Sequence, residues 1–335
     1  MMAGVEHRQS GDPRLAVVSA GRGVLRRMTH AVVFPAVEAC NAGLFRLAGL
    51  LLRHNPARLM PGGSDRVLVL APHPDDETLG CGGTICRHVM SGDQVYIVIV
   101  TDGGKSRAGG LNRATMIEMR RAEARHAMSA LLSCTGNAMR EDSKGALQLV
   151  QLGLPEGEWN EQDLVQYLGK LLEEFRPTIV YSTSRVDFHP EHLRVAAGFA
   201  KALSSSAGTY AERVRAYELQ VPLTPMLANL ISSVETTQQC KQEALASYHT
   251  QSGSFLWVPR HNRYLRALYR SGGALELFWE MAPRQFVALH ANEGIPVVHN
   301  FRSIRLRPFT DLAAWTVGIR KRRALRRLVD RNAAP

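Results

Sequence analysis

The chain has 335 residues, of which 45% are hydrophobic and 21% are charged, a composition that indicates a globular protein and excludes a fibrous or disordered one. Its net charge of +11 is unevenly distributed along the chain. Residues 1–61 hold eight Lys/Arg and three Asp/Glu, and residues 301–335 hold ten Lys/Arg and two Asp/Glu. The residues between them hold 23 Lys/Arg and 25 Asp/Glu. Five cysteines without a C-x-x-C pair exclude a disulfide framework and predict a reducing, cytoplasmic compartment.

The N-terminal flank carries an apolar stripe with helical spacing. Its members recur at intervals of 4, 3, 4, 3 and 4 residues: Val33, Val37, Cys40, Leu44, Leu47 and Leu51. Pro35 and the polar residues within 31–52 argue against a membrane-spanning helix. Two interpretations remain open, an interfacial helix on a membrane or a helix packed on the domain or on a partner chain, and we favour membrane contact.

The next element is a buried strand that ends in ligand-type residues. Val67–Leu70 has the β-branched and leucine-rich character of such a strand, and Pro72–Glu77 (PHPDDE) follows it. Ligands bind beyond the carboxyl ends of strands in a parallel α/β sheet, and three acids beside one histidine require a cation or unusual protonation. The stretch therefore predicts a metal site. Gly80, Gly82 and Gly83 lack the spacing of a dinucleotide-binding turn.

Strands and helices then alternate along the chain. Helices are expected near 78–91, over 113–133, near 161–175 and from 190, and strands over 94–101, near 147–152, over 178–183 and near 213–220. This order predicts an α/β fold, a Rossmann-like, doubly wound and mostly parallel sheet with helices on both faces, to which helical N- and C-terminal flanks are added. The loop that begins at Asp102 is expected to form a wall of the substrate pocket, with Lys105 or Arg107 meeting anionic groups.

A second group of ligand-type residues follows the strand at 178–183. His189 and His192 are three residues apart, so both rings lie on one side of a helical first turn. Two strand ends of this kind can converge on one ion. One or two histidines with a carboxylate suit zinc, and three protein ligands leave a position for water. Asp187 is a candidate for orienting one imidazole, with a turn or helix-capping role as the alternative.

These motifs resemble the PIG-L/LmbE-like family of zinc-dependent N-acetylglucosaminyl deacetylases. Pro72–Glu77 is similar to the family's first motif at every position, and His189–His192 is similar to its second, with Glu191 where Asp is commoner. Weaker similarities are found at Arg120-x-x-Glu123, at 152–157, and at Lys241 with the segment 248–251. The resemblance covers roughly residues 64–285.

The resemblance implies a role for each residue of the two motifs. His73, Asp76 and His192 would hold one Zn²⁺ per chain, Asp75 would be the general base, and His189 would stabilise or protonate the tetrahedral intermediate. Substrate contact by Arg120 is weighed against a simple ion pair with Glu123. The implied domain organisation is a basic N-terminal flank (1–61), a deacetylase domain (62–300) and a basic C-terminal segment (301–335).

The implied function is removal of the acetyl group from an N-acetylated amino sugar in a glycoconjugate or its precursor, lipid-linked or anionic. One alternative is a zinc amidase that acts on another N-acyl or thiol conjugate. An alternative of another class is a peripheral membrane or nucleic-acid binding protein whose metal is structural. An open coordination position argues against the last, because structural zinc has four protein ligands. An oligomer is compatible with the sequence.

The C-terminal flank ends in a basic cluster, Arg320–Arg327, that contains six cations in eight residues. Trp315 and other apolar residues precede it, a pattern that favours attraction to an anionic leaflet at the inner face of a membrane. RNA phosphates and a solvated tail are the competing interpretations, and no specific nucleic acid is expected. Between the flanks, residues 252–270 interleave aromatic and basic residues, which suits either an anionic sugar or a surface loop.

Overall fold

A computed structural model describes residues 32–52, 55–106, 110–133, 135, 147–206, 211–291 and 312–332. Its centre is an eight-stranded sheet with the order β1-β7-β8-β6-β5-β2-β3-β4. The strands are β1 (Ala57–Arg58), β2 (Arg66–Ala71), β3 (Gln94–Thr101), β4 (Leu147–Leu154), β5 (Ile179–Ser182), β6 (Arg213–Tyr217), β7 (Leu230–Ser233) and β8 (Leu275–Met281). β8 alone runs antiparallel to its neighbours. The predicted mostly parallel α/β sheet is confirmed.

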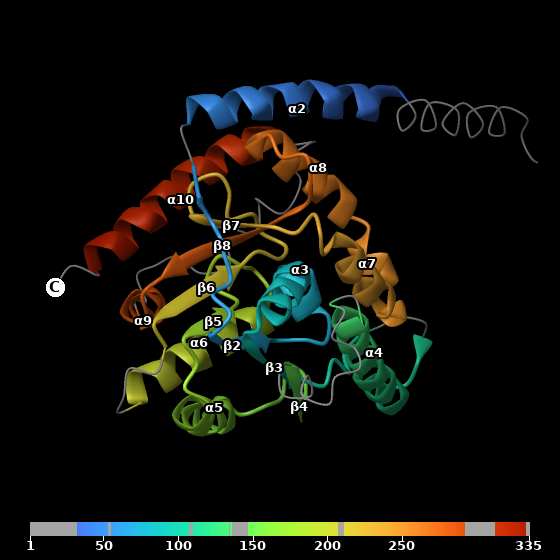
Figure 1. Ribbon diagram of the computed structural model, residues 1–335, viewed down its shortest axis with the longest axis vertical. Helices are drawn as coiled ribbons and strands as arrows, with labels where there is room; N and C mark the ends of the chain where they lie inside the picture. The colour runs from blue at the N-terminus through green and yellow to red at the C-terminus, as the bar shows by residue number, and fades with distance from the viewer. Residues whose placement is uncertain are drawn as a thin grey trace, which may run out of the picture.

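Helices cover both faces of the sheet (Figure 1). One side carries α3 (Asp76–Ser91), α4 (Arg113–Ser133) and α7 (Gln238–Ala246), and the other carries α5 (Glu161–Phe175), α6 (Pro190–Ser205) and α9 (Pro283–Ala291). The central strands are buried from both sides, so Val67–Ala71 is fully inaccessible to solvent. This burial explains why β2 is a continuous apolar run without alternation.

The sheet order places a topological switch point between β2 and β5. From β2 the chain proceeds outward through β3 and β4, and it then returns to the other side of β2 to form β5 and β6. Val67, Leu68 and Val69 of β2 pair in parallel with Ile179, Val180 and Tyr181. The loops after β2 and β5 therefore diverge at one edge of the sheet and open a crevice there, which is the usual ligand site of such folds.

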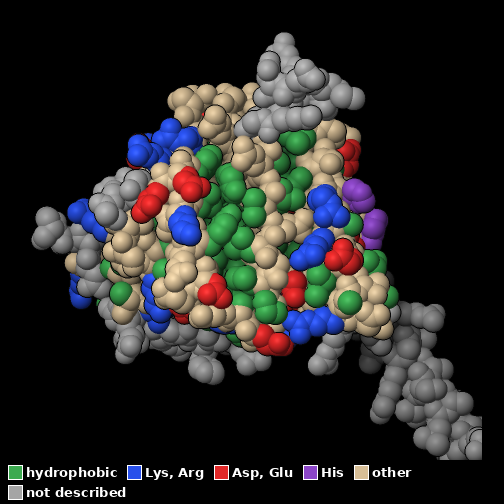
Figure 2. Space-filling view, turned by 90° about the horizontal axis from the view of Figure 1, so that it is seen from below, with side chains coloured by type: hydrophobic (Ala, Val, Ile, Leu, Met, Phe, Trp, Pro, Cys, Tyr) green, Lys and Arg blue, Asp and Glu red, His purple; other side chains and the backbone are tan. Residues whose placement is uncertain are grey.

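The edge strand β4 lies at the surface, and most of its residues are only half-buried. In Figure 1, β4, α4 and α5 are among the lowest elements, and Figure 2 views the molecule from that side. A strip of hydrophobic side chains runs between charged ones on this face.

Both flanks contribute helices that pack on the domain. The first is α2 (Phe34–Leu51), which lies along α8 (Val258–Tyr269), and the last is α10 (Leu312–Asn332). Phe45, Leu325 and Val329 are buried in the same hydrophobic core as the sheet. The hydrophobic core is continuous across both predicted boundaries. The division into two flanks and a 62–300 domain stays a prediction. The C-terminal flank is a docked helix in residues 312–332 and not a solvated tail.

Several elements were not predicted from the sequence. β1, β7 and β8 complete the sheet, and the aromatic and basic segment within 252–270 forms helix α8 where a surface loop was considered. Tyr264 of α8 is fully buried and bonds Thr224 Oγ1 and Trp315 Nε1, so it is a core residue. None of the described helices is long and apolar enough to cross a bilayer.

Candidate active site

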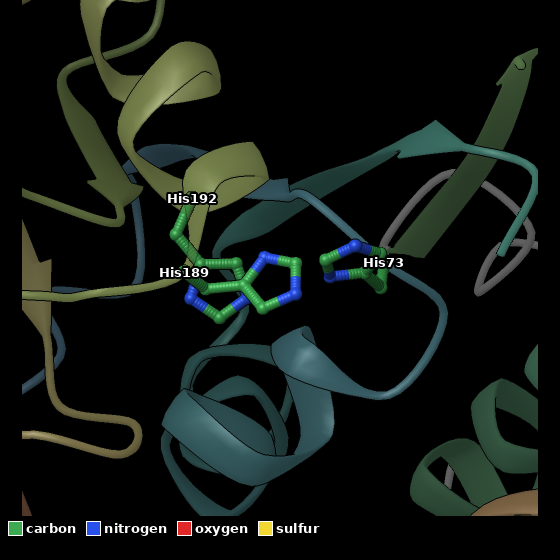
Figure 3. A group of neighbouring side chains, drawn as sticks. All are labelled: His73, His189 and His192. Atoms are coloured by element: carbon green, nitrogen blue, oxygen red, sulfur yellow. The ribbon is translucent and has the colours of Figure 1, made fainter. Parts of the chain in front are cut away.

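The two predicted motifs meet at the switch point. His73, Asp75 and Asp76 lie in the turn from β2 into α3, and His189 and His192 lie at the start of α6, after β5. Figure 3 shows His73 facing His189 and His192 from a separate segment of the chain. Ligand atoms of the three histidines lie within 4.8 Å of one another.

Asp76 joins two of these histidines. Its Oδ2 lies 3.2 Å from His73 Nδ1 and 3.2 Å from His192 Nε2. Tetrahedral zinc with bonds of 2.0–2.1 Å requires ligand atoms about 3.3 Å apart, and each of these two pairs has that spacing. The donor set of two imidazoles and one carboxylate is also one that zinc accepts. The residues therefore fit the predicted metal.

The pKa values show that this cluster requires positive charge. Burial by itself lowers the pKa of His73, but its hydrogen bonds to Asp76 and Glu156 raise it to about 9. Burial acts the same way on His192, and the Asp76 and Asp187 carboxylates raise the pKa of that ring well above its usual value. Protons on these rings supply the charge that a cation would bring, and a bound metal would displace them.

Asp75 is held beside the ligands in a strained conformation. Its backbone φ of 126° is uncommon for a residue other than glycine, and such strain concentrates at functional sites. Burial raises the pKa of Asp75 to about 7, although the Arg120 guanidinium, with Nη2 3.4 Å from Oδ2, opposes the shift. The carboxyl group is 11% exposed and lines the cavity, so it can exchange protons with a ligand there.

Glu77, the third carboxylate of the motif, turns away from the ligands. It accepts hydrogen bonds from the Thr78 and Tyr248 hydroxyls and from the backbone N–H of Asp75. Two carboxylates, not three, therefore face the candidate metal position. Because Glu77 holds the Asp75 backbone, its role is to fix the strained turn.

A kink in α3 also shapes this turn. Cys81 has non-helical angles, and the helix restarts where Glu276 of β8 accepts the N–H groups of Gly83 and Thr84. Lys241 donates to Glu276 Oε1 and to the carbonyl of Leu79, each at 2.7 Å. Lys241 is thus a partly buried structural group, with its side chain 15% exposed.

Asp187 contacts His192 as the sequence suggested. Its Oδ2 accepts a hydrogen bond from His192 Nδ1 at 2.9 Å, and its Oδ1 accepts the backbone N–H groups of Phe188 and His189. The proton on Nδ1 leaves His192 Nε2 free to face Asp76 and a metal. The turn role and the orienting role are both present in one side chain.

We predict that Asp187→Asn weakens zinc binding by about 10–100-fold, because a neutral amide holds the His192 tautomer less firmly. Zinc competition with a chromophoric chelator measures this change. Glu191→Gln is the matched control, since the Glu191 carboxylate bonds Trp159 Nε1 and pairs with Arg194 instead of with a candidate metal ligand. Equal zinc affinity of Asp187→Asn and the wild type would show that Asp187 does not support the metal ligand His192.

The other residues that were predicted to contact substrate lie in different surroundings. Arg120 is buried and donates to the carbonyl of Pro74, while Glu123 binds Thr250 instead of Arg120. Lys105 is half exposed at the cavity wall. Asp102 accepts the N–H groups of Gly104 and Glu156, so it shapes a turn and does not line the cavity. Arg107 lies outside the described residues.

Glu156 is a site residue that was not singled out from the sequence. Its Oε1 lies 3.5 Å from His73 Nε2, and although burial opposes the shift, the His73 hydrogen bond lowers the pKa of Glu156 to about 2. The weak family similarity at 152–157 was the available indication. Gln251 also lines the cavity and donates to Ser106 Oγ.

Residues at strand ends that can hold a metal beside a buried carboxylate define a class of α/β hydrolytic enzymes. Residues 68–203 match the family model described as PIG-L: GlcNAc-PI de-N-acetylase. This segment thus matches the PIG-L family, and the relatives found for it are named as deacetylases, which hydrolyse C–N amide bonds. The predicted family and enzyme class are confirmed, and the roles of individual residues stay predictions.

Curated relatives support this assignment. A 1D-myo-inositol 2-acetamido-2-deoxy-alpha-D-glucopyranoside deacetylase of Gordonia bronchialis is 26% identical over 206 residues, 50% of this chain and 67% of the relative. A deacetylase of the same name from Saccharopolyspora erythraea is 32% identical over 156 residues, 38% of this chain and 50% of the relative. The chain thus spans half of the second relative's length.

Solved structures share the fold. The N,N'-diacetylchitobiose deacetylase of Pyrococcus horikoshii superposes with a TM-score of 0.53 at 19% identity, covering 66% of this chain and 85% of that one. A 4-carboxy-2-hydroxymuconate hydratase of Pseudomonas putida superposes with a TM-score of 0.52 at 18% identity, covering 65% of this chain and 97% of the hydratase. The second example shows that this fold supports other chemistry, so function must be argued from the site.

Proposed function

We propose that the protein is a metal-dependent hydrolase that removes the acetyl group from an N-acetylated amino sugar of the N-acetylglucosamine type. The observation that carries the proposal is the convergence of His73, Asp76 and His192 beside the buried Asp75, within a segment of PIG-L type. Relatives named as deacetylases of an acetamido sugar support the substrate class.

We propose zinc as the metal, with His73 Nδ1, Asp76 Oδ2 and His192 Nε2 as its ligands. When bound, it would supply Lewis acidity toward the acetyl oxygen and a lowered pKa for a coordinated water. Glu156 would orient His73 and Asp187 would orient His192, and neither carboxylate would itself bind the metal.

Asp75 is the proposed general base. A pKa near 7 suits a group that must accept a proton from water and later give it to the leaving amine at neutral pH. Arg120 keeps part of the carboxylate charge in place, since burial alone would favour the neutral acid. Arg120 is therefore a positioning residue here, not a contact for the anionic part of a substrate.

His189 is the proposed stabiliser of the tetrahedral intermediate. Burial and the neighbouring His192 and His73 lower the pKa of His189 to about 4, so the ring is neutral near pH 7. Its Nδ1 accepts the backbone N–H of Glu191, which places the ring proton on Nε2. A neutral N–H donor would then meet the developing oxyanion, so of the two implied roles we propose stabilisation of the intermediate and not its protonation.

We predict that His189→Ala lowers kcat by roughly 10²–10³-fold with little change in KM, because the lost hydrogen bond forms in the transition state. His189→Gln, which keeps an N–H donor, should recover part of kcat. Steady-state kinetics on the zinc-loaded variants measures both parameters. A raised KM with unchanged kcat would assign His189 to substrate recognition instead.

The residues of the cavity wall indicate which chemical groups the acetylated sugar carries. Lys105, Gln220, Gln251 and Trp257 line the wall beyond the candidate metal position and offer a cation, two amides and an aromatic face. These groups suit a sugar that carries phosphate or another anion. We retain an anionic or lipid-linked glycoconjugate as the proposed substrate and an anionic membrane surface as a partner of the flanks.

The proposed location is the cytoplasm, at the inner face of the membrane. Cys40, Cys81, Cys86 and Cys240 are free thiols, which agrees with a reducing compartment. Cys134 lies outside the described residues.

The test is acetate release by the zinc-loaded full chain from a panel of acetylated sugars, nucleotide sugars and lipid-linked sugars. We expect acetate from at least one acetylated amino sugar and a release at least about 100-fold slower from the Asp75→Asn chain. The panel also includes N-acyl and thiol conjugates without a sugar. Turnover of these alone would replace the sugar deacetylase by the amidase alternative.

A further inference from the structure

Helix α2 has its polarity reversed relative to an ordinary surface helix. Its half-buried and buried polar residues, Glu38 and Asn41, lie on the side toward the domain. Its apolar stripe points to solvent, with Leu44 50%, Leu47 52% and Leu51 73% exposed. Arg46 is the only charged or polar side chain among the exposed residues of the described stretch 32–51. A surface helix of a soluble domain normally buries this stripe.

Specific contacts fix α2 in this orientation. Phe45, fully buried, stacks edge-on against Tyr264 and Trp315 with ring centroids 5.0 and 5.1 Å away. Glu38 pairs with Arg260 and Arg263 of α8 at 2.8 Å each. At Gly49 an added Cβ would lie 2.1 Å from the carbonyl oxygen of Leu268, so only glycine allows the close approach. Among the described residues these contacts come from one side of α2, and its other side is exposed.

The exposed stripe is large enough to indicate a binding surface. Its members are Val33, Val37, Cys40, Leu44, Leu47, Leu50 and Leu51. Single exposed apolar residues are normal, but a continuous row along a helix that the domain holds in place is typical of an interaction site. Figure 1 shows α2 at the outer edge of the molecule, above α8 and α10.

The charged residues beside α2 indicate what binds its exposed apolar stripe. Arg46, Arg263 and Arg266 border the helix, and all three are exposed. The acid of α2, Glu38, is already paired with arginines. In a symmetric dimer through this face, the same basic border would meet itself, which disfavours a second copy of this chain. An anionic lipid surface instead accepts the apolar stripe among its acyl chains and the arginines among its headgroups.

We propose that α2 is an interfacial helix that docks the protein on an anionic bilayer by its exposed apolar stripe. The N-terminal half of α2 lies beside the start of α8, because Glu38 pairs with Arg260. Trp257, directly before α8, lines the candidate catalytic cavity. Docking would thus hold the cavity close to lipid, which suits a lipid-linked substrate. This last consequence rests on the proposed deacetylase function, whereas the docking itself does not depend on that activity.

The test is flotation of the full chain with phosphatidylcholine vesicles that contain or lack phosphatidylglycerol, at low and high salt. The wild type should float with the anionic vesicles and be partly released by salt, because exposed charges are screened. Leu44→Gln/Leu47→Gln should weaken binding by about tenfold for each leucine, without a change in charge. Met90→Gln/Met119→Gln, which changes two exposed methionines of α3 and α4, is the matched control and should bind like the wild type.

Two results would overturn the proposal. One is a wild-type chain that does not float with anionic vesicles. The other is equal flotation of the leucine variant and the wild type. If that variant also changes from dimer to monomer in light scattering, the stripe is a contact between protein chains. Zinc content and acetate release from a small soluble sugar, measured on the same samples, report the proposed function separately.

Discussion

Replacing Asp75 by asparagine is expected to lower kcat by roughly 10²–10⁴-fold while the zinc content stays near that of the wild type. The amide cannot accept the proton of the attacking water, and Asp75 is not one of the proposed metal ligands. Its Oδ2 faces Arg120 instead. Metal analysis after dialysis and single-turnover acetate release measure the two quantities on one preparation.

Arg120→Gln is the companion variant for Asp75, because it removes the guanidinium that opposes the raised pKa of the carboxyl group. It should leave zinc bound and shift activity to higher pH, since the proton on Asp75 is then lost less readily. If Asp75→Asn lost its zinc as completely as a histidine variant, Asp75 would be a ligand and the base would have to be sought elsewhere.

Removing one ligand is expected to abolish both metal binding and turnover. His192→Ala eliminates Nε2, one of three atoms spaced for zinc, and should weaken zinc binding by more than about 100-fold. A ligand that binds only the folded state stabilises it by about 2.7 kcal/mol at a concentration of 100 Kd, so zinc should raise the Tm of the wild type but not of this variant. Thermal melts with and without zinc measure the difference.

His126→Ala is the control for the ligand variant, because His126 is an exposed histidine of α4 that does not line the cavity. It should keep the zinc-dependent rise in Tm and full activity. A His192→Ala chain that still binds one zinc tightly would point to the alternative set in which His189 joins His73 as a ligand.

The positions of both motifs at strand ends were predictable from the sequence. The strand before Pro72 and the strand before Ser184 are short apolar runs whose local pattern identifies them without knowledge of their neighbours. In an alternating α/β chain, the ends of such strands share one edge of the sheet. That His73, Asp76 and His192 lie together follows from this rule, and the structure places them there.

The direction of individual side chains at the site was decided by the tertiary structure. Glu77 is adjacent to Asp76 in sequence, yet it turns inward because Tyr248, 171 residues away, donates a hydrogen bond to it. Glu156 reaches His73 from the loop after β4. No local pattern contains these contacts, because each joins segments that meet only after the sheet has formed.

In the N-terminal flank, too, the sequence determined one property and the tertiary structure another. The sequence by itself determined that residues 33–51 form an amphipathic helix, since the spacing of its apolar residues is a local property of the chain. It did not determine which side faces the domain, because an apolar stripe is stabilised equally by a protein core and by lipid. The tertiary structure decided this point: Phe45, on the other side of the helix, enters the core between Tyr264 and Trp315, and so the stripe is left on the outside.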